Sequence, residues 1–152
     1  MRKKILYKVA AAVGLAAALG GCAPQMTKLE REVASKDVPT AMFVFFQKDS
    51  VVPVEGSEEV FDQTAAVLSV FDNIGVKVVA HKASDERKKI EGLPLDEARV
   101  RILMGHLSER GVADKVVSAI SQGNKESMAA AAGGDRAVDR RGELIFGLLP
   151  GG

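Results

Sequence analysis

The side chains able to do nucleophilic or metal chemistry are few and far apart in this chain. Its 152 residues include one cysteine, Cys22, and two histidines, His81 and His106. Metal sites and Cys/His catalytic pairs need several such residues at defined spacings, which this sequence lacks. No serine stands in a Gly-x-Ser-x-Gly setting, and no pair of carboxylates stands out for glycan hydrolysis. We therefore expect no enzyme, no metal and no cofactor.

Two short charged stretches stand next to predicted regular elements. The stretch AHKASDE contains Ser84 and Asp85, and LDEAR contains Arg99. The residues themselves have an ordinary interpretation. Asp85 stands in a charged run that is typical of a solvated loop. Arg99 lies at the shoulder of the apolar face of a predicted helix, where an arginine often packs its stem and exposes its head.

Other polar residues fit structural roles. Arg140 and Arg141 stand at the start of a predicted strand, where we expect them to pair with nearby acids such as Asp139 or Glu143 rather than contact a ligand. His81 is interpreted as a strand-end side chain and His106 as an ordinary helix residue.

The elements that must position these side chains alternate between strand and helix. Apolar and β-branched runs predict strands over residues 40–46, 76–81, 114–121 and 142–149. Helical spacing predicts helices over residues 57–75 and 93–111, with Ser57 as an N-cap and Gly75 as a C-terminal stop. The Gly- and Ala-rich residues 123–135 are expected to form a loop. This order indicates an α/β fold of the α+β sandwich type, in which two helices cover a sheet.

The N-terminus predicts export. Four basic residues precede an apolar run over 9–19, and small residues follow at 20 and 21. The run is too short for a membrane span and is typical of a signal peptide. Leu19-Gly20-Gly21-Cys22 resembles the lipobox of bacterial lipoproteins. That resemblance implies cleavage after residue 21, lipidation of Cys22 and, since Ala23 follows, an outer-membrane location. The alternative is an ordinary signal peptide with an incidental cysteine, or a free buried thiol. The sequence contains no second cysteine with which Cys22 could form an intramolecular disulfide.

Residues 22–37 are predicted to form a tether, with a short helix around 28–34, and residues 38–152 to form one domain. Without the signal peptide, 17 basic residues remain against 20 acidic ones, a net charge of −3. This balance argues against a nucleic-acid partner, because phosphate neutralisation dominates such binding.

Four stretches in the correct order resemble the OmpA-like domain of OmpA C-termini and peptidoglycan-associated lipoproteins. They are FVFFQKDSVVP, LPLDEARV, ERGVADKVV and DRRGELIF, within roughly residues 38–146. The resemblance implies a β-α-β-α-β-β domain with a mixed sheet of about four strands under two main helices. It also implies non-covalent binding of the peptidoglycan stem peptide.

The resemblance further implies which residues bind. In the family, an Asp after the second strand and an Arg early in the second helix grip the charged end of diaminopimelate. Arg99 matches that arginine, while the Asp position falls on Ala83, Ser84 or Asp85, of which Asp85 alone carries a carboxylate. Gly92 stands where the family has Asn.

Two functions therefore remain open. One is an outer-membrane lipoprotein, facing the periplasm, that tethers the membrane to peptidoglycan through Arg99, Asp85 and Ser84. The other is an OmpA-like domain with an altered ligand site that serves as an assembly module for another envelope protein.

Overall fold

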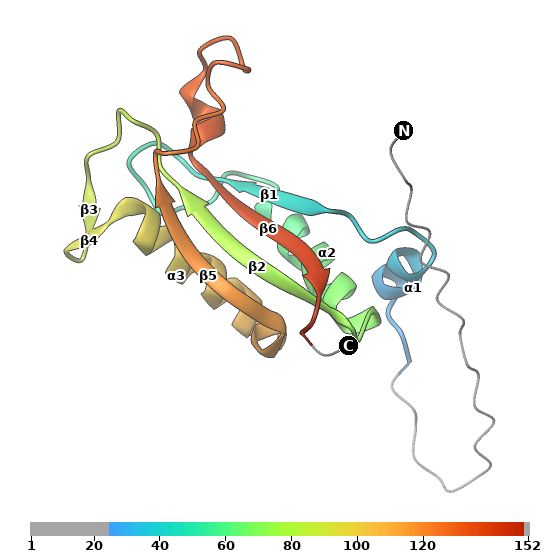
Figure 1. The fold of residues 1–152 in the computed structure, drawn as a ribbon. Helices are drawn as coiled ribbons and strands as arrows, with labels where there is room; N and C mark the ends of the chain where they lie inside the picture. The colour runs from blue at the N-terminus through green and yellow to red at the C-terminus, as the bar shows by residue number, and fades with distance from the viewer. Residues whose placement is uncertain (1–24, 151–152) are drawn as a thin grey trace, which may run out of the picture.

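The computed structural model describes residues 25–150 (Figure 1). Its helices are α1 (Lys28–Ala34), α2 (Ser57–Val70) and α3 (Leu95–Glu109), with two short 3-10 helices, η1 (Ala113–Lys115) and η2 (Arg136–Asp139). Its strands are β1 (Ala41–Phe45), β2 (Ile74–His81), β3 (Lys89–Ile90), β4 (Leu93–Pro94), β5 (Val116–Gly123) and β6 (Arg141–Leu148).

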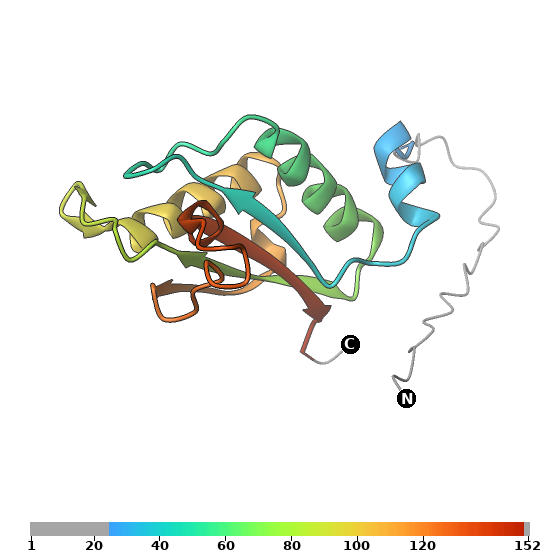
Figure 2. The ribbon, with the colours of Figure 1, turned by 90° about the horizontal axis from the view of Figure 1, so that it is seen from above.

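The main sheet is mixed and has four strands in the order β1-β6-β2-β5. β6 pairs antiparallel with both β1 and β2, and β5 pairs parallel with β2. Helices α2 and α3 lie together on one face of this sheet (Figures 1 and 2). The predicted α+β fold, with a four-stranded mixed sheet under two helices, is therefore confirmed.

The core lies between the sheet and these two helices. Every second residue of β2 points into it, as the two-residue period of a strand requires. The fully buried apolar residues at its centre are Val44, Phe61, Val67, Leu68, Val76, Val78, Ala80, Leu103, Leu107 and Leu144. Gly142 brings α3 close to β6, because a Cβ there would lie 2.5 Å from Leu103 Cδ1.

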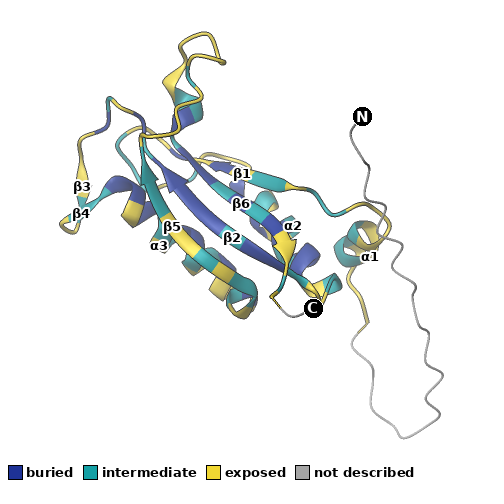
Figure 3. Ribbon diagram, in the orientation of Figure 1, coloured by how far each residue is buried: buried dark blue, intermediate teal, exposed yellow. Residues whose placement is uncertain are grey.

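No α-helix among residues 25–150 lies over the opposite face of the sheet (Figures 1 and 3). The strand registers place Phe43, Glu143, Val79 and Ile120 in one row across this face. Phe43 is 42% exposed and Ile120 is 38% exposed. We call this row the open-face row.

Two predicted helix boundaries were wrong. The N-cap of α2 is Gly56, whose φ of +87° suits glycine, while Ser57 is the buried first helical residue and donates its hydroxyl to Val54 O at 2.7 Å. Helix α2 ends at Val70, so Gly75 lies inside β2 and not at a helix end. The short β3–β4 hairpin was not predicted, because two-residue strands carry no periodic pattern.

Helix α1 packs against α2. Thr27 and Glu30 form a capping box at its start, and Val33 reaches the edge of the core. No helix among residues 25–150 is both long and apolar enough to cross a membrane. The predicted signal peptide and Cys22, the predicted lipidation site, lie outside the described residues.

Candidate functional site

Arg99 lies at the end of the sheet where β1 and β2 finish and α3 begins. It stands four residues after Leu95 and four before Leu103, so helical spacing places it in the buried stripe of α3 and not at its shoulder. Its side chain is 0% exposed. Phe46 lies beneath the guanidinium, 5.0 Å from ring centre to Cζ. A cation in such a position needs a full set of acceptors.

Five acceptors surround the Arg99 guanidinium. Nε donates to Ser50 O at 3.1 Å, and Nη1 donates to His81 O at 3.0 Å. Nη2 donates to Ser50 O at 3.0 Å and to Gln47 O at 3.3 Å. The carboxylate of Glu86 completes the set, accepting from Nη1 at 2.9 Å and from Nη2 at 2.7 Å. This forked geometry is the strong form of an arginine–carboxylate pair.

Glu86 joins two loops to this pair. Its carboxylate also accepts from Asp49 N at 2.9 Å and from Ala83 N at 2.8 Å. Burial alone would raise the pKa of Glu86, but the hydrogen bonds and charge of Arg99, with the two backbone N–H groups, lower it below its ordinary value. Loop 47–56 and loop 82–88 are thereby fixed against the start of α3.

Asp85 and Ser84 lie at the rim of this arrangement and do not touch the guanidinium in this structure. The Asp85 carboxylate forms an ion pair with Lys48 Nζ at 3.1 Å and is 29% exposed. The hydrogen bond and charge of Lys48 lower the pKa of Asp85, so it is ionised at neutral pH. Ser84 is exposed. The carboxylate beside Arg99 thus belongs to Glu86, which the sequence analysis did not single out.

A signal for Glu86 was present in the sequence. It stands three residues after Ala83, the spacing at which a side chain can return to a backbone N–H of its own turn. Asp85 and Glu86 are adjacent, and the sequence does not indicate which of two neighbouring carboxylates turns inward. In the structure Glu86 turns inward and is buried, as is Ala83, whereas Asp85 stays partly exposed and Ser84 is exposed.

Arg141 meets the expectation of pairing with acids. It donates to Glu143 Oε1 from Nε at 2.7 Å, and Asp139 Oδ1 lies 3.9 Å from Nη1. His81 lies beside this pair, 1% exposed, with Nε2 3.2 Å from Glu143 Oε1. Burial, with the charge of Arg141, lowers the pKa of His81 and keeps its imidazole neutral. This cluster is a structural one on the side of the sheet away from the helices.

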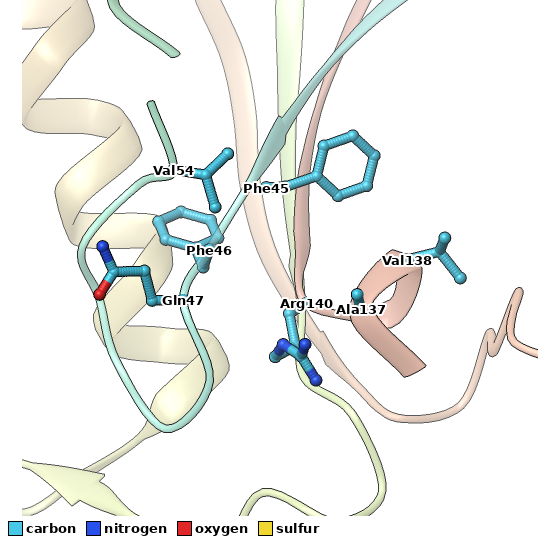
Figure 4. Close-up of a pocket in the computed structure, with 7 residues that line it drawn as sticks. All are labelled: Phe45, Phe46, Gln47, Val54, Ala137, Val138 and Arg140. Carbon is cyan, nitrogen blue, oxygen red and sulfur yellow. The ribbon is translucent and has the colours of Figure 1, made fainter. Parts of the chain in front are cut away.

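Arg140 differs from its neighbour. It makes no ion pair or side-chain hydrogen bond with any residue in the range 25–150, and its Nε is buried without a partner there. It lines a shallow pocket of about 370 Å³ at the end of β1 (Figure 4). The other lining residues are Phe45, Phe46, Gln47, Val54, Ala137 and Val138. Residues 25–150 contain no group of three or more His, Cys, Asp or Glu side chains placed to hold a metal ion.

This chain is similar to known proteins in its three-dimensional structure, and not detectably in its sequence. No known family profile matches the chain, and no curated protein matches it in sequence. Three solved structures illustrate the likeness. The OmpA-like domain of FopA1 from Francisella tularensis is 13% identical, with a TM-score of 0.57 over 72% of this chain and 73% of that one. The peptidoglycan-associated lipoprotein from Burkholderia pseudomallei is 22% identical, with a TM-score of 0.56 over 69% and 89%. The cell wall anchor of the Pseudomonas aeruginosa type VI secretion system is 19% identical, with a TM-score of 0.55 over 71% and 80%.

These structural similarities agree with the resemblance of the sequence to OmpA-like domains. The chain has the fold of OmpA-like domains.

Proposed function

We propose that this protein is an outer-membrane lipoprotein whose OmpA-like domain binds the peptidoglycan stem peptide without a covalent bond. The observation that carries the proposal is the buried Arg99–Glu86 pair. It stands where the resemblance places the family's ligand grip, at the start of α3 beside the loop after β2, and it is built into a matching fold.

In this proposal Arg99 is a positioning residue. All its N–H groups already have acceptors within the domain, so its contribution is to hold loops 47–56 and 82–88 in place. The groups at the rim of those loops then contact the ligand. The ionised Asp85 binds the ammonium group of a diaminopimelate-type stem peptide, and the Ser84 hydroxyl adds a hydrogen bond at the rim.

The anchor in this proposal is Cys22, lipidated after removal of residues 1–21. Several acyl chains hold a protein on a membrane durably, at about 0.8 kcal/mol for each buried methylene group. Figures 1 and 2 place α1, which follows Cys22 in the chain, at the opposite end of the domain from the β3–β4 hairpin beside the site. The site therefore lies at the end of the domain opposite the helix that leads to the anchor.

Co-sedimentation of the full chain, in detergent micelles, with protein-free sacculi tests the proposal. We expect saturable sedimentation that weakens by roughly tenfold in Asp85→Asn, the loss of one charged contact. Asp72→Asn is the matched control, because Asp72 is exposed at the other end of the domain. If the folded wild-type chain stays in the supernatant, the peptidoglycan proposal is wrong.

A second candidate, an assembly module for an envelope protein, is favoured by the open-face row. Two of its apolar side chains, Phe43 and Ile120, are exposed on the sheet face opposite α2 and α3. A photoreactive residue at position 43 would then cross-link to one envelope protein in cells, while the same residue at the exposed position 101 on α3 would not. No cross-link at position 43 would exclude this candidate.

A further inference from the structure

Arg99 and Arg140 both lie at the end of the domain that holds the candidate site, and of these two only Arg140 has N–H donors without an internal acceptor. Arg99 is fully buried and its N–H groups have internal acceptors. Arg140 is half-buried, and within residues 25–150 its guanidinium has no carboxylate or carbonyl partner. Its Nε is shielded from solvent, but Nη1 and Nη2 also lack an acceptor within residues 25–150 and stand on a half-buried side chain, so an incoming anion would accept hydrogen bonds from these two groups.

The backbone fixes where Arg140 stands. Phe46 N donates to Arg140 O at 2.8 Å, and Arg140 N donates to Ala137 O at 3.2 Å. The residue is thus held between the end of β1 and the end of η2. Loop 47–56, which begins beside it, also supplies two of the carbonyls that hold Arg99. Arg140 and the Arg99–Glu86 pair therefore share one end of the domain.

The walls around Arg140 are almost entirely apolar. Figure 4 shows Phe46 and Val54 on one side of the end of β1 and Phe45 on the other, with Arg140 drawn below and between them. The Gln47 side chain is exposed at the pocket margin and can pair with a peptide group. The pocket thus combines a free guanidinium, a small apolar surface and one amide.

We propose that this pocket binds the carboxyl end of a peptide that terminates in an apolar residue, with Arg140 binding the terminal carboxylate. A guanidinium binds a carboxylate through two parallel N–H bonds. The apolar side chains of Phe45, Val54 and Val138 line the same pocket and can pack against the side chain next to that carboxylate. The inference deepens the proposed function and rests on it, because it names the part of a stem peptide that this second contact would hold.

The test uses two probes, N-acetyl-alanyl-alanine with a free carboxylate and the same dipeptide with a terminal amide. Each is titrated into the isotope-labelled full chain in detergent micelles, and the amide signals of Phe46 and Arg140 are followed. We expect the wild-type chain to bind the acid at least about tenfold more tightly than the amide, since a hydrogen bond to a charged group is among the strong ones.

Arg140→Gln should bind acid and amide equally, while retaining the weak binding of the amide. Arg101→Gln is the matched control, because it removes an exposed arginine from α3, and it should keep the wild-type preference. If Arg140→Gln still binds the amide probe, its pocket is intact, and the lost preference for the acid probe reports loss of the carboxylate contact alone. An acid preference that survives in Arg140→Gln, or a wild-type chain that prefers neither probe, overturns the inference.

Failure of the proposed function has a different signature. If the wild-type chain prefers the acid through Arg140 but does not sediment with sacculi, this pocket assignment stands and the peptidoglycan proposal fails. If the chain sediments with sacculi but shows no preference for the acid probe, the peptidoglycan proposal stands and this pocket assignment fails.

Discussion

Arg99 holds together the loops at the end of the domain that contains the candidate site. Its removal leaves Glu86 buried without its cation and leaves three carbonyls without a donor. Breaking one partner of a buried ion pair costs far more than the pair itself contributes. A binding assay with an Arg99 variant alone would therefore confuse loss of contact with loss of structure.

We expect Arg99→Met to lower the free energy of unfolding by about 3–5 kcal/mol. Arg101→Met, two residues along the same helix and exposed, should change it by less than about 0.5 kcal/mol. Urea denaturation followed by circular dichroism measures both. Equal midpoints for the two variants would show that Arg99 does not hold the loops.

His81 gives the domain a pH dependence near neutrality. Its pKa is lowered by burial and by Arg141, against the opposing charges of Glu143, Glu126 and Asp139. The unfolded chain therefore takes up this proton at a higher pH than the folded chain. The stability that the neutral imidazole contributes is complete above its ordinary pKa of 6.5 and falls as the pH drops below that value.

The free energy of unfolding should therefore be lower at about pH 5.5 than at about pH 7.5 in the wild-type chain. His81→Gln has no proton to take up, so its stability should vary less across the same interval. Urea titrations at both pH values give the comparison. A wild-type slope that is flat, or that is unchanged in His81→Gln, contradicts this account of the buried cluster.

At the scale of elements, the close contact of α3 with β6 sets the spacing of the two layers. A Cβ at Gly142 would meet Leu103, whereas a Cβ at Gly147 on the same strand would meet nothing within 4 Å. We expect Gly142→Ala to destabilise the fold by about 1–3 kcal/mol, the usual cost of overpacking. Gly147→Ala should stay within about 0.5 kcal/mol of the wild type. Thermal denaturation of both variants decides this, and similar melting temperatures would contradict the packing argument.

Sequence patterns predicted these elements well where many residues carried the signal. The four main strands and the two long helices each repeat an apolar period over several residues, so their existence and order followed from the pattern. The two ends of α2 depended on single residues. The φ of +87° makes Gly56, and not Ser57, the N-cap, and strand pairing places Gly75 in β2. Glycine at position 75 joins β2 because Gly147 pairs with it across the sheet.

The candidate site was less predictable than the fold. The family resemblance and the helix position predict a role for Arg99, but its complete burial depends on carbonyl groups 49 and 18 residues away in sequence, in loop 47–56 and at the end of β2. The inward turn of Glu86 depends on the same loops. The spacing between Ala83 and Glu86 is local, but no local pattern distinguishes Glu86 from its neighbour Asp85, so Asp85 is the carboxylate that the sequence predicts next to Arg99.

At the scale of the whole molecule, the docking of α1 limits how far the domain can extend from its proposed anchor. If α1 stays packed on α2, only residues 23–26 separate Cys22 from the helix cap at Thr27, a reach of about 17 Å. If the whole of 22–37 were free, the reach would be about 50 Å.

Leu29→Asp, which places a charge in the half-buried contact between α1 and α2, should release this restraint. Energy transfer from a dye on the domain to a labelled vesicle should then fall relative to the wild type. Glu32→Gln on the exposed side of α1 is the control and should behave as wild type. Equal transfer in all three chains would mean that α1 does not restrain the domain.

The central claim is that the end of the domain beside Arg99 binds a peptidoglycan stem peptide. The most direct measurement is an amide-shift titration of the full chain with a soluble stem peptide that contains diaminopimelate. The account predicts saturable shifts confined to loops 47–56 and 82–88, including the Asp49 and Ala83 amides that bond Glu86, and to Arg140. An unchanged spectrum at saturating peptide, or shifts confined to the open-face row around Phe43 and Ile120, would contradict it.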